Sequence, residues 1–145
     1  MEAYINYFAY GSNMDEKQMM QRCKNAEFVD SARLLGHKFI INSRGVATIV
    51  SKSDSEVYGI LWRITKQDEE KLDRCEGIEH NVYRKEKVSV TTYKGKHVEV
   101  MVYIATNSTP GSPRHDYMER IVAAARLHNF PDNYIKELES WLIKQ

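Results

Sequence analysis

Gly11, Ser12 and Asn13 form a run of small residues directly after the apolar segment that ends at Tyr10. This run has two interpretations. Glycine tolerates positive φ angles and serine or asparagine can cap a helix, so the run could be a plain turn between a strand and a helix. It could also be a binding loop, because small side chains let a ligand reach backbone N–H groups at the start of a helix. Taken alone, the motif favours the turn, because turns of this composition are common.

Glu76 is a second candidate for chemistry, because it lies in the last turn of a predicted helix, directly before Gly77. The negative end of the helix macrodipole disfavours a carboxylate there. If the side chain faces an apolar pocket, desolvation also raises its pKa, as a general acid/base near neutral pH requires. On an exposed helix end it is an ordinary glutamate with a small local penalty, and its position alone favours this interpretation. Glu79 and His80 lie close by in the sequence and compete for any catalytic role.

Other catalytic and metal-binding patterns are absent from the sequence. The five histidines show no HExxH or other ligand spacing, and Cys23 and Cys75 are not spaced as a metal or redox pair. We therefore expect no metal site, and two reduced cysteines that are buried as small hydrophobic residues. No G-x-S-x-G elbow, Walker loop or dinucleotide fingerprint occurs, so no cofactor is expected.

The small-residue run is predicted to join a strand to a helix. Residues 5–10 form an apolar strand pattern, and residues 15–23 a short helix with Ser12 and Asp15 in capping-box spacing. Four further strands are predicted between Gly, Ser, Asn and Asp residues, at 28–34, 38–42, 47–50 and 57–64. A sheet is therefore expected to carry the candidate loop.

The helix that leads to Glu76 has clear start and stop signals. Thr65 and Asp68 are spaced as a capping box, and Gly77 is expected to end the helix. The helical period turns Leu72 and Cys75 inward. After this helix the predicted elements are a β-hairpin, a surface loop and two helices, at residues 84–92 with 96–104, 107–113, 114–128 and from 132 onward.

The composition bounds the class of protein. The chain has 145 residues, of which 42% are hydrophobic and 28% charged, which predicts one globular domain over residues 1–145. The net charge of +1 is evenly scattered, so neither nucleic acid nor an anionic membrane is an expected partner. No apolar run approaches the length of a membrane span, and the first residues do not resemble a signal peptide. We expect a cytoplasmic protein with a small-molecule partner, and the sequence leaves its oligomeric state open.

Several motifs in fixed order resemble the gamma-glutamylcyclotransferase-like family across nearly the whole chain. They are "YFAYGSNM" at 7–14, "GVATIV" at 45–50, "EVYGILWRI" at 56–64, "LDRCEGIEHNVYRKEKV" at 72–88 and a closing stretch that includes "SPRHDYMERIVAAARLHNFPDNY". The resemblance implies an α+β fold, with a mixed, mostly antiparallel sheet curled toward a small barrel and helices packed outside it. It also implies an enzyme that cyclises a γ-glutamyl compound to 5-oxoproline and releases the amine of the γ-amide, without a cofactor.

The same resemblance implies roles for individual residues. Glu76 matches the catalytic carboxylate of the family, and Tyr117 matches a tyrosine that contacts the substrate. The substrate-binding loop is matched by Tyr10, Gly11, Ser12 and Asn13. Two alternatives to a cyclotransferase for amino-acid or amine conjugates stay open. One is an enzyme that removes γ-glutamyl from a lysine side chain or a biosynthetic amine. The other is a non-catalytic module that binds a carboxylate ligand, which is favoured if Glu76 faces solvent.

Overall fold

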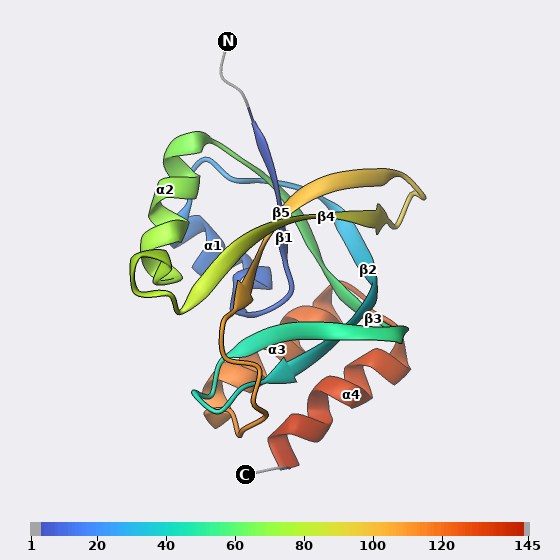
Figure 1. Cartoon of the computed structure of the whole chain (residues 1–145). Coiled ribbons are helices and arrows are strands. Elements are labelled where there is room, and N and C mark those ends of the chain that lie inside the picture. Colours follow the sequence, from blue (N-terminus) through green and yellow to red (C-terminus); the bar gives the residue numbers. More distant parts are fainter. Residues whose placement is uncertain (1–3, 144–145) are drawn as a thin grey trace.

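A closed β-barrel forms the centre of the molecule in the computed structural model, which describes residues 4–143 (Figure 1). Its strands within these residues are β1 (Ile5–Ala9), β2 (Glu27–Ile41), β3 (Ala47–Ile64), β4 (Tyr83–Thr92) and β5 (His97–Ala105). Around the barrel the strand order is β1-β3-β2-β4-β5. Neighbouring strands are antiparallel except β1 and β5, whose parallel pairing closes the barrel. The expected α+β fold with a mixed, mostly antiparallel barrel is confirmed.

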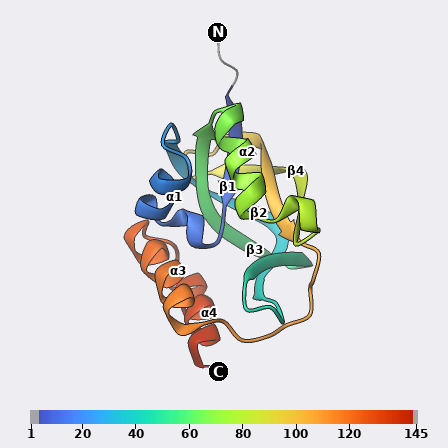
Figure 2. The same ribbon diagram turned by 90° about the vertical axis from the view of Figure 1, so that its left-hand side faces the viewer.

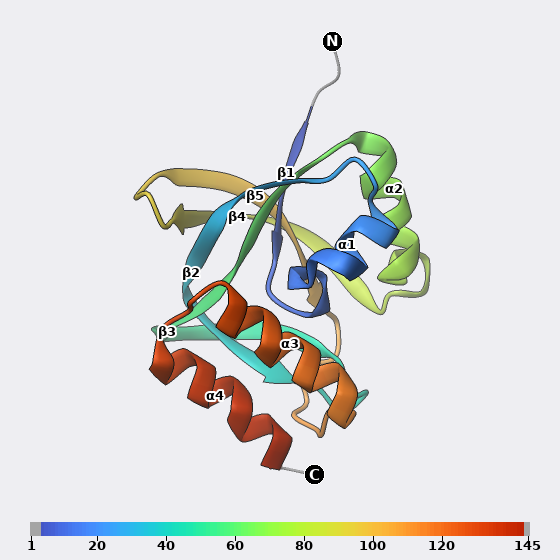
Figure 3. The ribbon, with the colours of Figure 1, turned by 180° about the vertical axis from the view of Figure 1, so that it is seen from behind.

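The helices lie outside the barrel (Figures 2 and 3). They are α1 (Glu16–Arg22), α2 (Lys66–Cys75), α3 (His115–Leu127) and α4 (Asp132–Ile143), with the single 3₁₀ turns η1 (Ser12–Met14) and η2 (Ile78–His80). Helices α3 and α4 pack against each other and cover the extended part of β2 and β3 (Figure 3). Helix α1 lies beside α2 at the other end of the barrel, and both α1 and α3 contact η1, the turn that follows β1 (Figure 2).

Two long strands replace four predicted short ones. The predicted breaks around residues 35–37 and 51–56 are wrong, because β2 and β3 continue through them as one antiparallel pair. The pair absorbs the irregular residues as register shifts, between Phe28 and Asp30 and between Leu35 and His37. Gly36 has a φ of +76° at the second shift, as a bulge often requires. Ladder hydrogen bonds therefore prevail over local turn preference.

The two helix starts next to the candidate site differ in how they are capped. In α2 the predicted capping box is confirmed: the Asp68 N–H donates to Thr65 Oγ1 over 3.1 Å, and the Thr65 N–H to Asp68 Oδ2 over 3.3 Å. For α1 the prediction is wrong, because Asp15 is the cap and accepts from the Gln18 N–H over 3.1 Å. Ser12 instead begins η1, so the chain makes a separate turn before α1 starts.

The structure also tests the predictions that both cysteines are buried and that α2 ends at Gly77. Leu72 is fully buried, as expected, but Cys75 is exposed, so the inward orientation predicted for it is wrong. Cys23 is buried, and its thiol donates to the backbone oxygen of Asp68 over 3.6 Å. The helix ends at Gly77, which has a φ of +65°, as predicted.

Candidate active site

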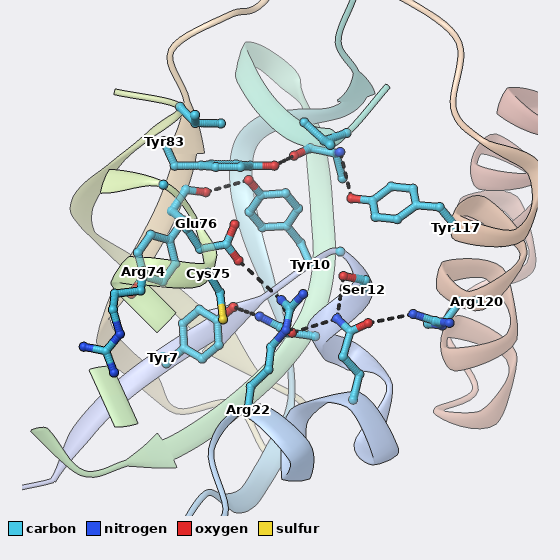
Figure 4. A pocket seen from close by; sticks show the side chains of 18 of the residues that line it. Tyr7, Tyr10, Ser12, Arg22, Arg74, Cys75, Glu76, Tyr83, Tyr117 and Arg120 are labelled. Carbon is cyan, nitrogen blue, oxygen red and sulfur yellow. Dashed lines mark hydrogen bonds and ion pairs between the residues drawn. The ribbon is translucent and has the colours of Figure 1, made fainter. Parts of the chain in front are cut away.

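A cavity of about 400 Å³ opens beside the end of β1, between the C-terminal end of α2 and the first turn of α3 (Figure 4). The six residues singled out by the family resemblance all line it: Tyr10, Gly11, Ser12, Asn13, Glu76 and Tyr117. Glu79 and His80 are exposed on η2 and are not part of this lining. The fold thus brings three distant segments together. That these residues contact a substrate stays a prediction.

Another cavity, of about 610 Å³, lies between the β4–β5 hairpin tip and the turn from α3 to α4. Its lining includes Tyr58, Tyr93 and Phe130 but no carboxylate or thiol. The imidazole of His128 also lines it and stacks on Phe28, whereas the cavity at Glu76 encloses a desolvated carboxylate, so the cavity at Glu76 is the better candidate for chemistry.

The turn after α2 directs Glu76 into its cavity. Glu76 is the C-cap of the helix, and its N–H donates to the Leu72 oxygen over 2.8 Å. Gly77 then reverses the chain in a left-handed conformation, and a Cβ there would lie 3.0 Å from Val82. Only 17% of the Glu76 side chain is exposed. The carboxylate therefore faces the protein interior and not solvent.

Tyrosines from four elements line the cavity around this carboxylate. They are Tyr7 and Tyr10 at β1, Tyr83 on β4 and Tyr117 on α3 (Figure 4), together with Tyr103 on β5. Burial raises the pKa of each phenol, and the negative charge of Glu76 raises it further. The phenols thus stay neutral. Because their rings keep water away, burial raises the pKa of Glu76 from 4.5 to about 7, against the lowering effect of Arg22.

The hydroxyl groups of these tyrosines fix the cavity wall. Tyr10 donates to the Tyr103 backbone oxygen over 2.6 Å, and Tyr83 donates to the Ala47 oxygen over 2.6 Å. The Tyr117 hydroxyl accepts from the Ala47 N–H over 2.9 Å, which leaves its own proton available to a ligand. Tyr10 can therefore offer a substrate its ring, whereas Tyr117 can offer a hydrogen bond.

There is little space for a side chain at Gly11. Its φ of −113° lies outside the left-handed region, so Gly11 does not use the positive φ that glycine permits. A Cβ on Gly11 would lie 3.3 Å from the Ala47 Cβ and 3.9 Å from the Tyr117 hydroxyl. Any side chain here would therefore narrow the cavity between the loop and Tyr117.

The polar side chains of the loop bind other parts of the protein. Asn13 is buried; its Nδ2 donates to the Tyr7 hydroxyl over 3.0 Å, and its Oδ1 accepts from Gln18 and Arg22 over 2.9 and 3.0 Å. The Ser12 hydroxyl accepts from Gln18 over 2.7 Å. These bonds hold the loop in place and use its polar side chains within the protein.

Sequence reasoning missed several residues of this site, chiefly Arg22, Tyr7, Tyr83 and Tyr103. No local signal marks them: an arginine is ordinary in the last turn of a helix, and tyrosine is common in strands. The tyrosines can be recognised only once the register of the barrel strands is known, because the register decides which side chains face the cavity.

Two further observations concern ligands and membranes. In the described part of the chain, no group of three or more His, Cys, Asp or Glu side chains is arranged to hold a metal ion. None of the helices described is long and apolar enough to cross a membrane.

Comparisons with known proteins define first the class and then the family. A solved structure named gamma-glutamyl cyclotransferase superimposes with a TM-score of 0.89 at 30% identity, covering 95% of this chain and 88% of that one. This α+β barrel with a cavity beside its first strand is thus the scaffold of an enzyme. Residues 56–138 match the AIG2-like family. Curated gamma-glutamylcyclotransferases of Mus musculus and Homo sapiens are both 31% identical, over 92% of this chain and 77% of their own length. The chain therefore belongs to the gamma-glutamylcyclotransferase family.

Proposed function

We propose that the protein is a γ-glutamyl cyclotransferase that converts a γ-glutamyl amide to 5-oxoproline and a free amine or amino acid. The observation that carries this proposal is the Glu76 carboxylate, enclosed in the cavity with a pKa raised to about 7. Family membership supports the same reaction. We further propose that residues 1–145 act as one catalytic domain in the cytoplasm, on a small-molecule substrate.

Ring closure needs the substrate to be held in a curled conformation. Its own α-amine attacks its own γ-carbonyl, so the new C–N bond closes a five-membered ring and the amide C–N bond to the leaving amine breaks. Holding the two reacting groups together supplies the proximity that separate molecules would lack. A cavity of about 400 Å³ suits a small substrate of this kind.

Glu76 is the proposed proton carrier. The attacking amine loses one proton as the bond forms, and the leaving nitrogen must gain one before it departs. A carboxylate beside both nitrogens can accept the first proton and deliver it to the second, so that no net proton is consumed. A pKa of about 7 suits both steps, because neither protonation state is strongly favoured at neutral pH.

The loop at residues 11–13 is proposed to bind the negatively charged parts of the substrate. In η1 the first N–H groups have no acceptor within the turn, as at any helix start. Such groups can donate to the α-carboxylate or to the oxygen of the γ-carbonyl as charge develops on it. Tyr117, whose hydroxyl lies next to Gly11, is proposed as a further donor to the substrate.

The non-catalytic alternative is less well supported, because it predicts a Glu76 that faces solvent, whereas only 17% of the side chain is exposed. The two enzyme alternatives, release of a free amino acid or amine and release of a lysine side chain, differ only in the leaving group.

A substrate panel tests the proposal. The protein is incubated with γ-glutamyl dipeptides, γ-glutamyl-ε-lysine and glutathione, and 5-oxoproline is measured by mass spectrometry. Glu76→Gln should lower turnover by about 100- to 10,000-fold, because it keeps the shape but cannot carry a proton. Glu79→Gln, which changes an exposed carboxylate nearby, is the matched control. Turnover of Glu76→Gln within a few-fold of wild type would exclude Glu76 as the acid/base.

A further inference from the structure

Arg22 lies between the two halves of the proposed site. It is the last residue of α1, and its guanidinium extends toward Glu76 (Figure 4). The same nitrogen, Nη1, donates to Asn13 Oδ1 over 3.0 Å and lies 3.9 Å from Glu76 Oε1. About a third of the Arg22 side chain is exposed, 33%, so the charge is partly shielded from water.

The first contact determines how the Asn13 amide is oriented. A guanidinium can only donate hydrogen bonds, so the Asn13 atom that faces it must be the oxygen. The Asn13 amide nitrogen is then directed at Tyr7, whose hydroxyl becomes an acceptor. Gln18 donates to the same oxygen, and its own amide is held in this orientation by Arg120, which donates to Gln18 Oε1 over 2.7 Å. Arg22 and Gln18 therefore fix the hydrogen-bond direction through Asn13 together, and of the two only Arg22 also reaches Glu76.

The contact with Glu76 places the positive charge of Arg22 in a cavity wall whose other groups facing the carboxylate are neutral. The groups that face Glu76 from β1, β4, β5 and α3 are phenols, from Tyr7, Tyr10, Tyr83, Tyr103 and Tyr117, and all of them stay protonated. From α1 comes Arg22, which lowers the pKa of Glu76. Three more arginines line the cavity, but Arg120 donates to Gln18 over 2.7 Å, and Arg74 and Arg114 are exposed. Arg22 therefore supplies the positive charge that favours the ionised form of Glu76, whereas burial favours the protonated form.

We propose that Arg22 is a positioning residue of this active site, which orients Asn13 of the loop and stabilises the ionised Glu76 carboxylate from one place. The inference rests on the proposed role of Glu76. It assigns Arg22 no contact with the substrate. Removal of the Arg22 guanidinium should therefore disturb the substrate-binding loop and the proton carrier together.

Three variants separate these effects. Arg22→Met removes the charge and the hydrogen bond, so kcat/KM at pH 7 should fall by up to about 100-fold, the loss that a displacement of about 1 Å in an active site can cause. The acid limb of its pH profile should move to higher pH, because Glu76 stays protonated over a wider range. Arg22→Lys keeps the charge, so the acid limb should return toward that of wild type while kcat/KM recovers only in part. Lys24→Met removes an exposed charge two residues further on and should not move the limb.

The inference is overturned if Arg22→Met leaves the acid limb in place, or if Lys24→Met moves it equally. A second measurement does not depend on turnover. Titration of the Glu76 carboxyl carbon by ¹³C NMR should give a higher pKa in Arg22→Met than in wild type and in Arg22→Lys. If wild type forms no 5-oxoproline from any substrate, the proposed function fails, whereas this titration still decides whether Arg22 controls Glu76.

Discussion

Glu76→Gln should make the protein more stable at alkaline pH, in addition to its loss of activity. Burial raises the pKa of Glu76 from 4.5 to about 7 in the folded protein. In the unfolded chain the same group titrates near its ordinary value. Between pH 4.5 and about pH 7 the folded state therefore binds more protons than the unfolded state, so the free energy of unfolding decreases as pH rises. The loss is complete once the pH exceeds the folded pKa.

The magnitude follows from the size of the shift. At 1.36 kcal/mol per pKa unit, ionised Glu76 destabilises the fold by about 3 kcal/mol above pH 8. Its side chain is 17% exposed, so water screens this cost only slightly. Glutamine carries no charge and therefore avoids the cost at every pH. The variant should match wild type near pH 4.5 and exceed it by about 3 kcal/mol at pH 8.5, which corresponds to several degrees in Tm.

Urea denaturation of both proteins at pH 4.5, 6, 7 and 8.5 measures this difference directly. Other titrating groups affect both proteins alike, so the difference between the two curves isolates Glu76. Glu79→Gln, with its exposed side chain, should show no such pH-dependent gain. A Glu76→Gln gain that is the same at pH 4.5 and pH 8.5 would show that Glu76 is not desolvated in the folded protein, and the proposed acid/base role would lose its physical basis.

Two further predictions concern the loop and the thiol. Ser12→Ala removes one acceptor from Gln18 and should cost about 1 kcal/mol of stability with turnover retained, whereas Gly11→Val should abolish turnover, because its Cβ meets Ala47 at 3.3 Å. In thermal-shift measurements 5-oxoproline should raise the Tm of wild type but not of folded Gly11→Val, and equal shifts would mean that the loop is only a turn. Cys75→Ala should change neither Tm nor kcat/KM by much, since Cys75 is exposed; complete inactivation at unchanged Tm would indicate a thiol mechanism.

Features set by neighbouring residues could be predicted from the sequence. The Thr65–Asp68 capping box and the Gly77 helix end involve residues within one turn of each other, and both were identified. The two long strands could not, because serine and aspartate favour turns locally while the β2–β3 pairing supplies ladder bonds that a single segment does not reveal. Local preference thus fails where tertiary pairing decides.

In the candidate site, too, some features could be predicted from neighbouring residues and others could not. Glu76 could be singled out because a carboxylate before a helix-ending glycine is locally unfavourable. Its desolvation could not be established, because it depends on phenols from β1, β4, β5 and α3 that only the closed barrel brings together. Arg22 was missed for a related reason: its contacts with Asn13 and Glu76 span nine residues in one case and 54 in the other. Family resemblance supplied the grouping that local patterns lacked.

The parallel pairing of β1 and β5 has a consequence for how the enzyme is made. Strand β1, which leads into the loop at residues 11–13, pairs with β3 and with β5, and Tyr7 lies opposite Met101. A chain emerging from the ribosome therefore presents β1 long before its second neighbour exists, and contacts of such large sequence separation form slowly. Until β5 arrives, β1 has an open edge on the side that closes the barrel. Glu76 then lacks the Tyr103 wall, and Tyr117 of α3 follows later in the chain, so catalytic competence should not appear before the barrel has closed.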